Sequence, residues 1–198
     1  MSEVRDVESA WQPRGFTQET LDWVPWVEPI TLADADERQR PLLEGQRGES
    51  PYFRLLARNA EVLAQRSAND KEIFYGRDGL SRAERELAAT VTSRHNGCVY
   101  CASVHSRFTT QLSKRGADVQ RLLDEGNAVR IDERWDAVID FVTALAAQPP
   151  RADPEHVARL RALGYTETEI HDLVLSTASF SWANRMMLSL GEPELPAD

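Results

Sequence analysis

Residues 84–107 read ERELAATVTSRHNGCVYCASVHSR, and this stretch decides both the fold and the candidate chemistry of the chain. It holds the only two cysteines, Cys98 and Cys101, in a C-x-x-C spacing, and His105 follows four residues later. An Asn-Gly pair lies directly before Cys98. Because both residues of that pair tolerate the left-handed conformation of a helix end, we expect one helix to stop there and another to begin at the first cysteine.

The two cysteines and the histidine fall on one face of the second helix, since they are separated by three and four residues. A free cysteine has a pKa of about 8.5, but unpaired N–H groups in the first turn of a helix favour the thiolate. His105 is placed to exchange a proton with Cys101, directly or through a water molecule. If one sulfur is oxidised to a sulfenic acid, the other can condense with it, and an external dithiol can reduce the resulting disulfide. The pattern predicts a site for peroxide reduction or disulfide exchange.

Helical periodicity extends over most of the remaining chain. Between residues 51 and 190 no segment shows the period-two alternation of a strand, so we predict an all-α fold. Residues 71–80, with two glycines, are expected to form a short helical turn and a loop. Apolar spacing, capping boxes at 81–84 and 166–169, and glycine stops predict helices over 51–69, 81–95, 98–116, 117–125, 132–148, 153–164 and 166–190.

Residues 1–50 differ from the rest, because they hold three of the five tryptophans and several prolines that interrupt helices. We expect a Trp-rich extended arm here and a helical domain over residues 51–198. The arm could lie over its own domain, with Trp11, Trp23 and Trp26 buried in grooves, or cross onto a neighbouring subunit. The sequence leaves both arrangements open.

The composition excludes some classes of function. A net charge of −9 over 198 residues argues against nucleic-acid binding through a broad basic surface. No apolar run reaches the roughly 18 residues that span a bilayer, and the polar N-terminus lacks the pattern of a signal peptide. We therefore expect a cytoplasmic protein without a membrane role. In that reducing compartment, a C-x-x-C pair is more often catalytic or metal-binding than structural.

The central motif resembles a known signature. Glu86-Leu87, the run N-G-C-x-Y-C over residues 96–101, and His105 are similar to the motif of AhpD-like alkylhydroperoxidases. These enzymes form part of the carboxymuconolactone decarboxylase superfamily, and the resemblance is strongest to its peroxidase-related branch. The run FSWANR at 180–185 resembles a helix that the branch carries after the motif. The resemblance covers roughly residues 50–190 and implies an AhpD-like helical domain that assembles into trimers or hexamers, with the site near a subunit interface.

The resemblance also implies roles for individual residues. Glu86 matches the proton-relay glutamate, Cys101 the cysteine that attacks peroxide, Cys98 the one that resolves it and faces the reductant, and His105 the histidine that manages the proton. The implied partners are a hydroperoxide and an external dithiol, thioredoxin-like or lipoyl-type, with no bound cofactor. Tyr100 is a departure, because the best-studied members have histidine there. A tyrosine, with a pKa near 10, can donate a hydrogen bond but is a poor base at neutral pH.

Four further residues have an open role. His95 could reach the site from the end of the preceding helix or simply stabilise that end. Trp182, Asn184 and Arg185 could line the site or a subunit contact. Glu84 is explained by helix capping, and we assign it no chemistry.

Two alternatives to the peroxidase interpretation remain. A zinc-binding or redox-sensing helical module without turnover is one, because Cys98, Cys101 and His105 supply three ligands and Glu86 or water could complete the four that a structural zinc usually takes. Cofactor-free decarboxylation, the chemistry of the superfamily's founding branch, is the other. Enzymes of that branch lack the C-x-x-C pair, so its presence here argues against them.

Overall fold

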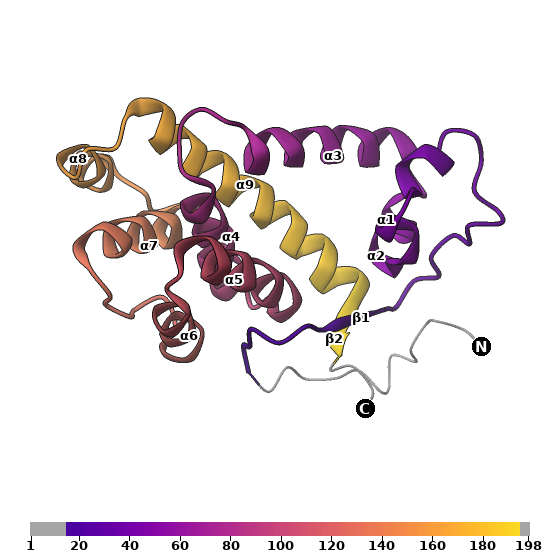
Figure 1. Ribbon diagram of the computed structural model, residues 1–198, viewed down its shortest axis with the longest axis horizontal. Coiled ribbons are helices and arrows are strands. Elements are labelled where there is room, and N and C mark those ends of the chain that lie inside the picture. The colour runs from indigo at the N-terminus through magenta and orange to yellow at the C-terminus, as the bar shows by residue number, and fades with distance from the viewer. Residues whose placement is uncertain (1–14, 195–198) are drawn as a thin grey trace.

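The computed structural model describes residues 15–194 and confirms the all-α fold (Figure 1). A long C-terminal helix runs diagonally through the molecule, and shorter helices surround it. The helices are α1 (Gln46–Glu49), α2 (Pro51–Leu56), α3 (Ala60–Tyr75), α4 (Arg82–Asn96), α5 (Val99–Ser113), α6 (Gly116–Glu125), α7 (Glu133–Ala146), α8 (Pro154–Ala162) and α9 (Glu167–Leu190). The remaining elements are a 3-10 helix, η2 (Arg40–Leu43), and two short strands, β1 (Asp22–Pro25) and β2 (Gly191–Glu194).

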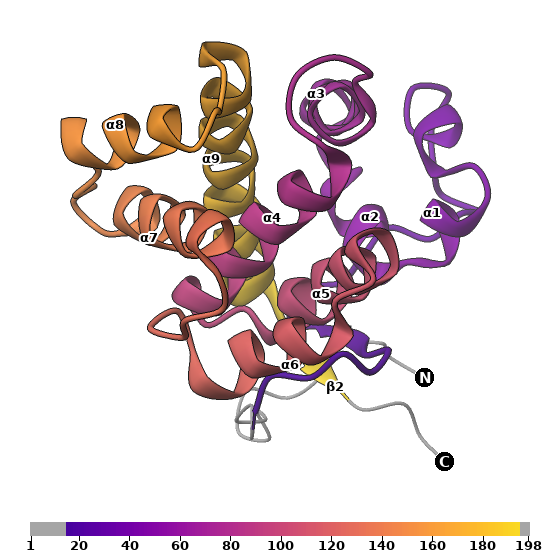
Figure 2. The same cartoon turned by 60° about the vertical axis from the view of Figure 1, so that its left-hand side comes forward.

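Helix α4 is the centre of the fold, packed between α5 on one side and α7 and α9 on the other (Figure 2). The sequence predicts an inward face led by Leu87 and Val91, yet every residue from Glu84 to Ser93 is buried. A helix that is covered on all sides needs partners for its polar side chains as well.

The first two charges of the buried run Glu84-Arg85-Glu86 are paired, which offsets a cost of several kcal/mol per buried ion. Glu84 accepts hydrogen bonds from Arg134 Nε at 2.8 Å and from Tyr165 Oη at 2.5 Å. Arg85 donates to Asp172 Oδ2 at 2.8 Å and to three backbone carbonyls of the preceding loop and α3. These contacts fix the rotation of α4 about its axis, and they thereby set the direction in which the Glu86 side chain points.

The segment predicted as one helix over 51–69 is two helices with a break between them. Helix α2 ends at Leu56, and Asn59 caps α3, because its Oδ1 accepts a hydrogen bond from the Val62 amide at 3.1 Å. This local bond competes with continuation of the first helix. Helix α3 then runs to Tyr75, through part of the stretch predicted as a turn and loop.

The helix after the cysteines ends earlier than predicted. It stops at Ser113, where Lys114 adopts the left-handed conformation with φ 62°, and Gly116 is the first residue of α6. A Cβ on Gly116 would lie 3.1 Å from Thr110 Cγ2. This glycine therefore permits a close approach of two helices and is not the helix stop that the sequence predicts.

The described part of the N-terminal arm packs on its own chain. Strand β1 pairs antiparallel with β2, with Trp23 opposite Pro193. The Trp23 side chain is 4% exposed and meets the Tyr52 ring edge-on at 5.6 Å between centroids. The arm also contains η2 and α1, so it is less extended than predicted. Residues 1–14, with Trp11, lie outside the described residues.

We predict that Gly191→Ala loosens this strand pair. A Cβ at this position would lie 2.4 Å from both Trp23 Cζ2 and the Val24 carbonyl oxygen, so the buried indole or the strand must move. Such overpacking costs about 1–3 kcal/mol of unfolding free energy, which denaturant titration followed by tryptophan fluorescence will measure. Gly15→Ala is the control, because a Cβ there meets nothing within 4 Å. Equal stability of the two variants would contradict the prediction.

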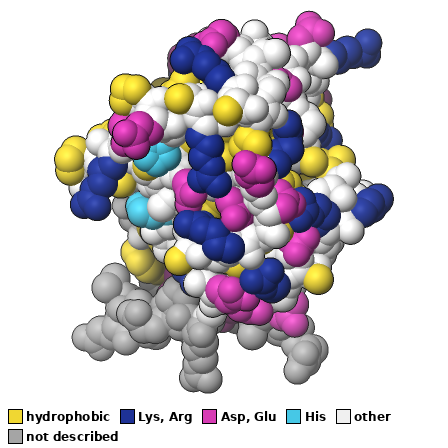
Figure 3. All heavy atoms as spheres, turned by 90° about the vertical axis from the view of Figure 1, so that its left-hand side faces the viewer, with side chains coloured by type: hydrophobic (Ala, Val, Ile, Leu, Met, Phe, Trp, Pro, Cys, Tyr) yellow, Lys and Arg dark blue, Asp and Glu magenta, His cyan; other side chains and the backbone are white. Residues whose placement is uncertain are grey.

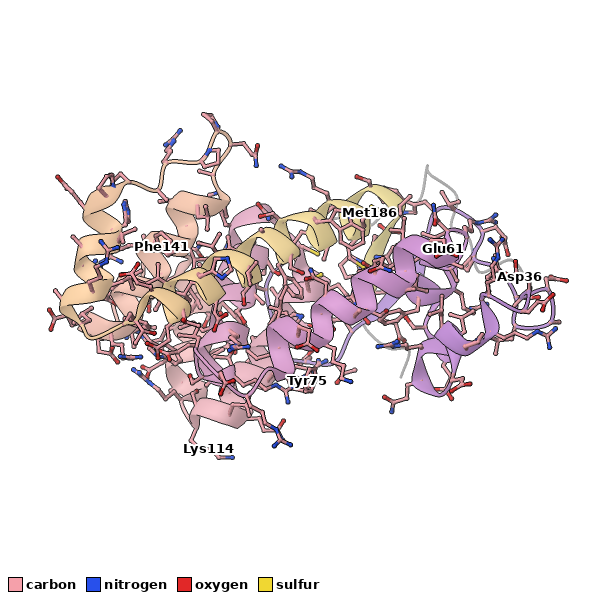
Figure 4. The ribbon with its side chains drawn as sticks, turned by 90° about the horizontal axis from the view of Figure 1, so that it is seen from above. Asp36, Glu61, Tyr75, Lys114, Phe141 and Met186 are labelled. Carbon is pink, nitrogen blue, oxygen red and sulfur yellow. The ribbon has the colours of Figure 1, made fainter. Side chains whose placement is uncertain are left out.

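The buried apolar side chains form two clusters. One joins α4 to α6, α7, α8 and the first half of α9. The other joins the arm, α2 and α3 to the second half of α9, and it contains Cys98 and Cys101. Helices α3 and α9 lie side by side and run in opposite directions, so that Glu61 at the start of α3 lies nearer Met186 than Tyr75 does (Figure 4). The two cysteines, at the start of α5, therefore lie in the same buried cluster as residues of α3, α9 and the arm.

The surface shows no separation of charge on the side formed by α6, α7 and α8. Basic and acidic side chains are interspersed there (Figure 3). Within residues 15–194, none of the helices is long and apolar enough to cross a bilayer.

Candidate functional site

The two cysteines lie at the turn between α4 and α5. Gly97, with φ 79°, ends α4 in the left-handed conformation, and Cys98 is the N-cap residue of α5. The Cys98 amide donates to the Ser93 carbonyl at 2.9 Å, which ties the turn to α4. Cys101 follows in the first turn of α5. The turn thus presents both sulfurs at the positive end of the α5 dipole.

The two thiols are free, buried and hydrogen-bonded to each other. Cys98 is 2% exposed and Cys101 is 6% exposed. The bond between them lowers the pKa of Cys98, since the thiol of Cys101 donates to its thiolate, and it raises the pKa of Cys101 well above the ordinary thiol value. The pair therefore loses its first proton readily and holds the second firmly. The arrangement therefore favours the thiolate on Cys98 and the thiol on Cys101.

Asn184 of α9 contacts both sulfurs and lowers the pKa of each by hydrogen bonding to the thiolate. Its side chain is completely buried and fixed at both ends. The amide nitrogen donates to Ser93 Oγ at 3.0 Å, and the amide oxygen accepts from Asn96 Nδ2 at 3.0 Å. The sequence offered this residue as a lining or subunit-contact residue; the structure places it beside the thiol pair.

We predict that Asn184→Ala reduces thiolate formation. A hydrogen bond to a charged group contributes about 1.5–3 kcal/mol, so the rate of alkylation by iodoacetamide at neutral pH should fall about tenfold or more, with the pH–rate profile displaced to higher pH. The lost partners of Ser93 and Asn96 should also lower the unfolding free energy by about 1–3 kcal/mol. Arg185→Ala, at the exposed next position, is the control. An unchanged pH–rate profile in Asn184→Ala would contradict this role.

His105 and Glu86 form a hydrogen-bonded pair beside the thiols, in which Glu86 is buried and His105 is partly buried. His105 Nδ1 lies 2.5 Å from Glu86 Oε2, and Arg82 Nε pairs with the other carboxylate oxygen at 3.3 Å. The Glu86 side chain is 2% exposed. The imidazole ring meets Phe180 edge-on at 4.1 Å between centroids, and the tilted ring of Phe74 lies 5.6 Å from it. Because Glu86 requires a donor at Nδ1, Nε2 is the nitrogen that can accept a proton, and it has no hydrogen-bond partner within the described ranges.

A cavity of about 210 Å³ adjoins Cys101 and the Glu86–His105 pair. Cys101, His105 and Glu86 line it, whereas Cys98 does not. Tyr100, whose pKa burial raises, also lines it. The rest of the wall is largely aromatic, with an ion pair at one side. These further lining residues are Ser50, Tyr52, Phe53, Arg66, Asp70, Phe74, Tyr75, Val104, Phe108, Phe180, Ala183 and Met187.

The structure separates three sequence candidates from this cavity. His95 is exposed and lines a different hollow, together with arginines of α8 and of the two loops that flank α7. Trp182 is part of a groove between α3 and α9. Arg185 is exposed on α9. Sequence reasoning missed Tyr52 and Phe74, because α2 and α3 precede the motif and nothing in their spacing indicates that they close over it.

A metal centre has no support in the described part of the chain, where no group of three or more His, Cys, Asp or Glu side chains is arranged to hold an ion. The three ligands that the sequence allowed for zinc, Cys98, Cys101 and His105, do not form such a group.

Residues 60–147, which include the thiol pair, Glu86 and His105, match the model of the carboxymuconolactone decarboxylase family. The match is confined to this central segment, and the fold of the chain is similar to that of AhpD-like proteins. No curated protein sequence matches it at a significant level.

Several solved structures have a similar fold. An AhpD core protein from Ralstonia eutropha JMP134, described as peroxidase-related, is similar with a TM-score of 0.73 and 21% identity over 84% of this chain and 90% of that one. A peroxidase-related protein from Silicibacter sp. TM1040 has a TM-score of 0.62 and 26% identity over 69% of this chain and 71% of that one. The debrominase Bmp8 has a TM-score of 0.67 and 20% identity over 87% of this chain and 91% of that one. Two of these structural neighbours are described as peroxidase-related, and the third is a debrominase.

Proposed function

We propose that the chain reduces organic hydroperoxides to alcohols with the Cys98–Cys101 pair and is recycled by an external dithiol. One observation carries the proposal: Cys101, hydrogen-bonded to Cys98, lines one small cavity together with His105, which Glu86 holds in place. The arrangement supplies a nucleophile, a resolving thiol and a proton acceptor within one site.

The first step transfers oxygen to sulfur. His105 Nε2 takes the thiol proton, directly or through water, and Glu86 stabilises the imidazolium. The Cys101 thiolate attacks the terminal oxygen of R–O–O–H, an S–O bond forms and the O–O bond breaks. The products are Cys101–S–OH and RO⁻, and the imidazolium returns its proton to RO⁻ to give the alcohol. The peroxide is reduced by two electrons and the sulfur is oxidised by two.

The second step resolves the sulfenic acid. The Cys98 thiol, already hydrogen-bonded to the Cys101 sulfur, attacks it, so that a disulfide forms and water leaves. An external dithiol then exchanges with this disulfide, which restores both thiols and oxidises the dithiol. Because Cys98 is buried, the resolved pair is reached through the cavity, and this favours a slender lipoyl-type dithiol over a thioredoxin-like protein.

The walls of the cavity support an organic substrate. Phe74, Phe108 and Phe180 contribute apolar surface that hydrogen peroxide would leave unused. The volume of about 210 Å³ is below the roughly 300 Å³ at which drug-sized ligand sites begin, so the organic group is small. We propose a trimer or hexamer in the cytoplasm as the working form, on the resemblance alone.

The test is turnover of cumene hydroperoxide with dihydrolipoamide as the dithiol, against reduced thioredoxin as the alternative. We expect many equivalents of peroxide to be consumed per protein, with faster turnover on dihydrolipoamide. A redox sensor without turnover would consume one equivalent and stop with both dithiols. That result would contradict the proposed enzymatic activity and indicate that the thiol pair acts as a redox sensor.

A further inference from the structure

One polar group of the cavity wall has no role in the steps above. Tyr52, from α2, is 7% exposed, and its hydroxyl is shielded from solvent. That hydroxyl has no hydrogen-bond partner among residues 15–194. Buried phenols usually find a partner, since an unsatisfied hydroxyl in the interior is costly. An orphaned donor in the wall of a reactive cavity points to a ligand.

The ring of Tyr52 is held firmly in place. Trp23 meets it edge-on at 5.6 Å and Phe53 at 5.5 Å between centroids. The position of the hydroxyl is therefore set by the arm and α2. Helix α5 places the sulfur of Cys101 and helix α4 places Glu86 independently of it, so three separate elements meet at this cavity.

The hydroxyl lies within electrostatic reach of the thiols. Burial is the main cause that raises the pKa of Tyr52, and negative charge on Cys101, then on Cys98, raises it further against the opposing effect of Arg66. No hydrogen bond joins the hydroxyl to Cys101, although both residues line the same cavity. The phenol keeps its proton at neutral pH and stays a donor throughout the reaction.

We propose that the Tyr52 hydroxyl donates a hydrogen bond to the leaving oxygen of a hydroperoxide bound in this cavity, which makes Tyr52 a catalytic residue. The proposal rests on the proposed function. When the Cys101 thiolate attacks the terminal oxygen, charge develops on the oxygen that carries R. The phenol stabilises this charge without losing its proton, and His105 remains the group that finally protonates RO⁻.

Tyr52→Phe tests the role, because the ring and its aromatic contacts stay and only the orphaned hydroxyl is lost. The rate of Cys101 oxidation by cumene hydroperoxide should fall about 100- to 1,000-fold, as when one donor to a developing oxyanion is removed. Iodoacetamide has no oxygen leaving group, so the rate of its reaction with the thiols should stay within about twofold of wild type. Tyr165→Phe is the matched control, because Tyr165 is a second buried tyrosine whose hydroxyl donates to Glu84 and which does not line the cavity.

The other outcomes overturn the proposal in distinguishable ways. Fast oxidation of both wild type and Tyr52→Phe removes the role of Tyr52 and leaves peroxide reduction standing. An equal loss of oxidation and alkylation assigns Tyr52 to the thiolate or the fold instead of to the leaving oxygen. Wild type that reacts no faster than free cysteine overturns peroxide reduction itself, and the role of Tyr52 with it.

Discussion

Cys101→Ser should lower the rate constant for reaction with cumene hydroperoxide at least about 1,000-fold, because a serine hydroxyl supplies no thiolate to attack the peroxide. Cys101 is the sulfur that lines the cavity beside His105. The measurement is stopped-flow oxidation under excess peroxide, followed by the loss of thiol. No other change in the chain should have a larger effect on this step.

Cys98→Ser is the matched control for the attacking sulfur. It should keep the first oxidation, stop at the sulfenic acid and lose turnover, since no resolving thiol remains. The control is needed because the hydrogen bond between the thiols lowers the pKa of Cys98 and raises that of Cys101, which on charge alone favours Cys98 as the nucleophile. We assign the attack on peroxide to Cys101, because its sulfur lines the cavity and that of Cys98 does not. Transfer of the Cys101 proton to Cys98 along the hydrogen bond would place the thiolate on Cys101. Rapid oxidation of Cys101→Ser would reverse the assignment.

Glu86→Gln should slow the oxidation of Cys101 about 100-fold or more, in the range of a lost general acid–base contribution. An amide keeps a hydrogen bond to His105 Nδ1 but removes the charge that stabilises the imidazolium. It also leaves Arg82 without its ion pair. The measurement is the same stopped-flow reaction, with the pH–rate profile recorded for both proteins.

Glu84→Gln is the matched control, because Glu84 is a second buried acid on the same helix. Its partners, Arg134 and Tyr165, lie away from the thiols, so we expect oxidation within about threefold of wild type. The unfolding free energy should fall by about 1–3 kcal/mol, the cost of an impaired buried network. A comparable loss of rate in both variants would show that the effect of Glu86→Gln is structural.

The sequence predicts those parts of the site that lie within one local segment. The C-x-x-C spacing, the histidine one turn later and the Asn-Gly helix break are all visible in residues 84–107, and the structure brings Glu86 and His105 into contact. Periodicity and capping residues also predict the all-α class and most helix ends. These features depend on neighbours within a few residues, which a single sequence records.

The contributions from distant segments could not be predicted. Tyr52 and Phe74 reach the cavity from helices that the periodicity merged or cut short, because the Asn59 cap was not recognised as a break. Asn184 contacts the thiols from the far end of the chain, and its spacing on α9 resembles that of any core residue. The pairing of β1 with β2 joins segments at opposite ends of the described chain, without a sequence alternation long enough to indicate it.

The most direct test of the account is to count thiols and weigh the protein after one equivalent of cumene hydroperoxide. We predict that wild type loses both thiols at a rate well above that of free cysteine. The product should be lighter by two hydrogen atoms, which identifies a disulfide between Cys98 and Cys101. Two intact thiols after the reaction would contradict peroxide reduction by this pair, and a product that has gained oxygen without forming a disulfide would contradict Cys98 as the resolving thiol.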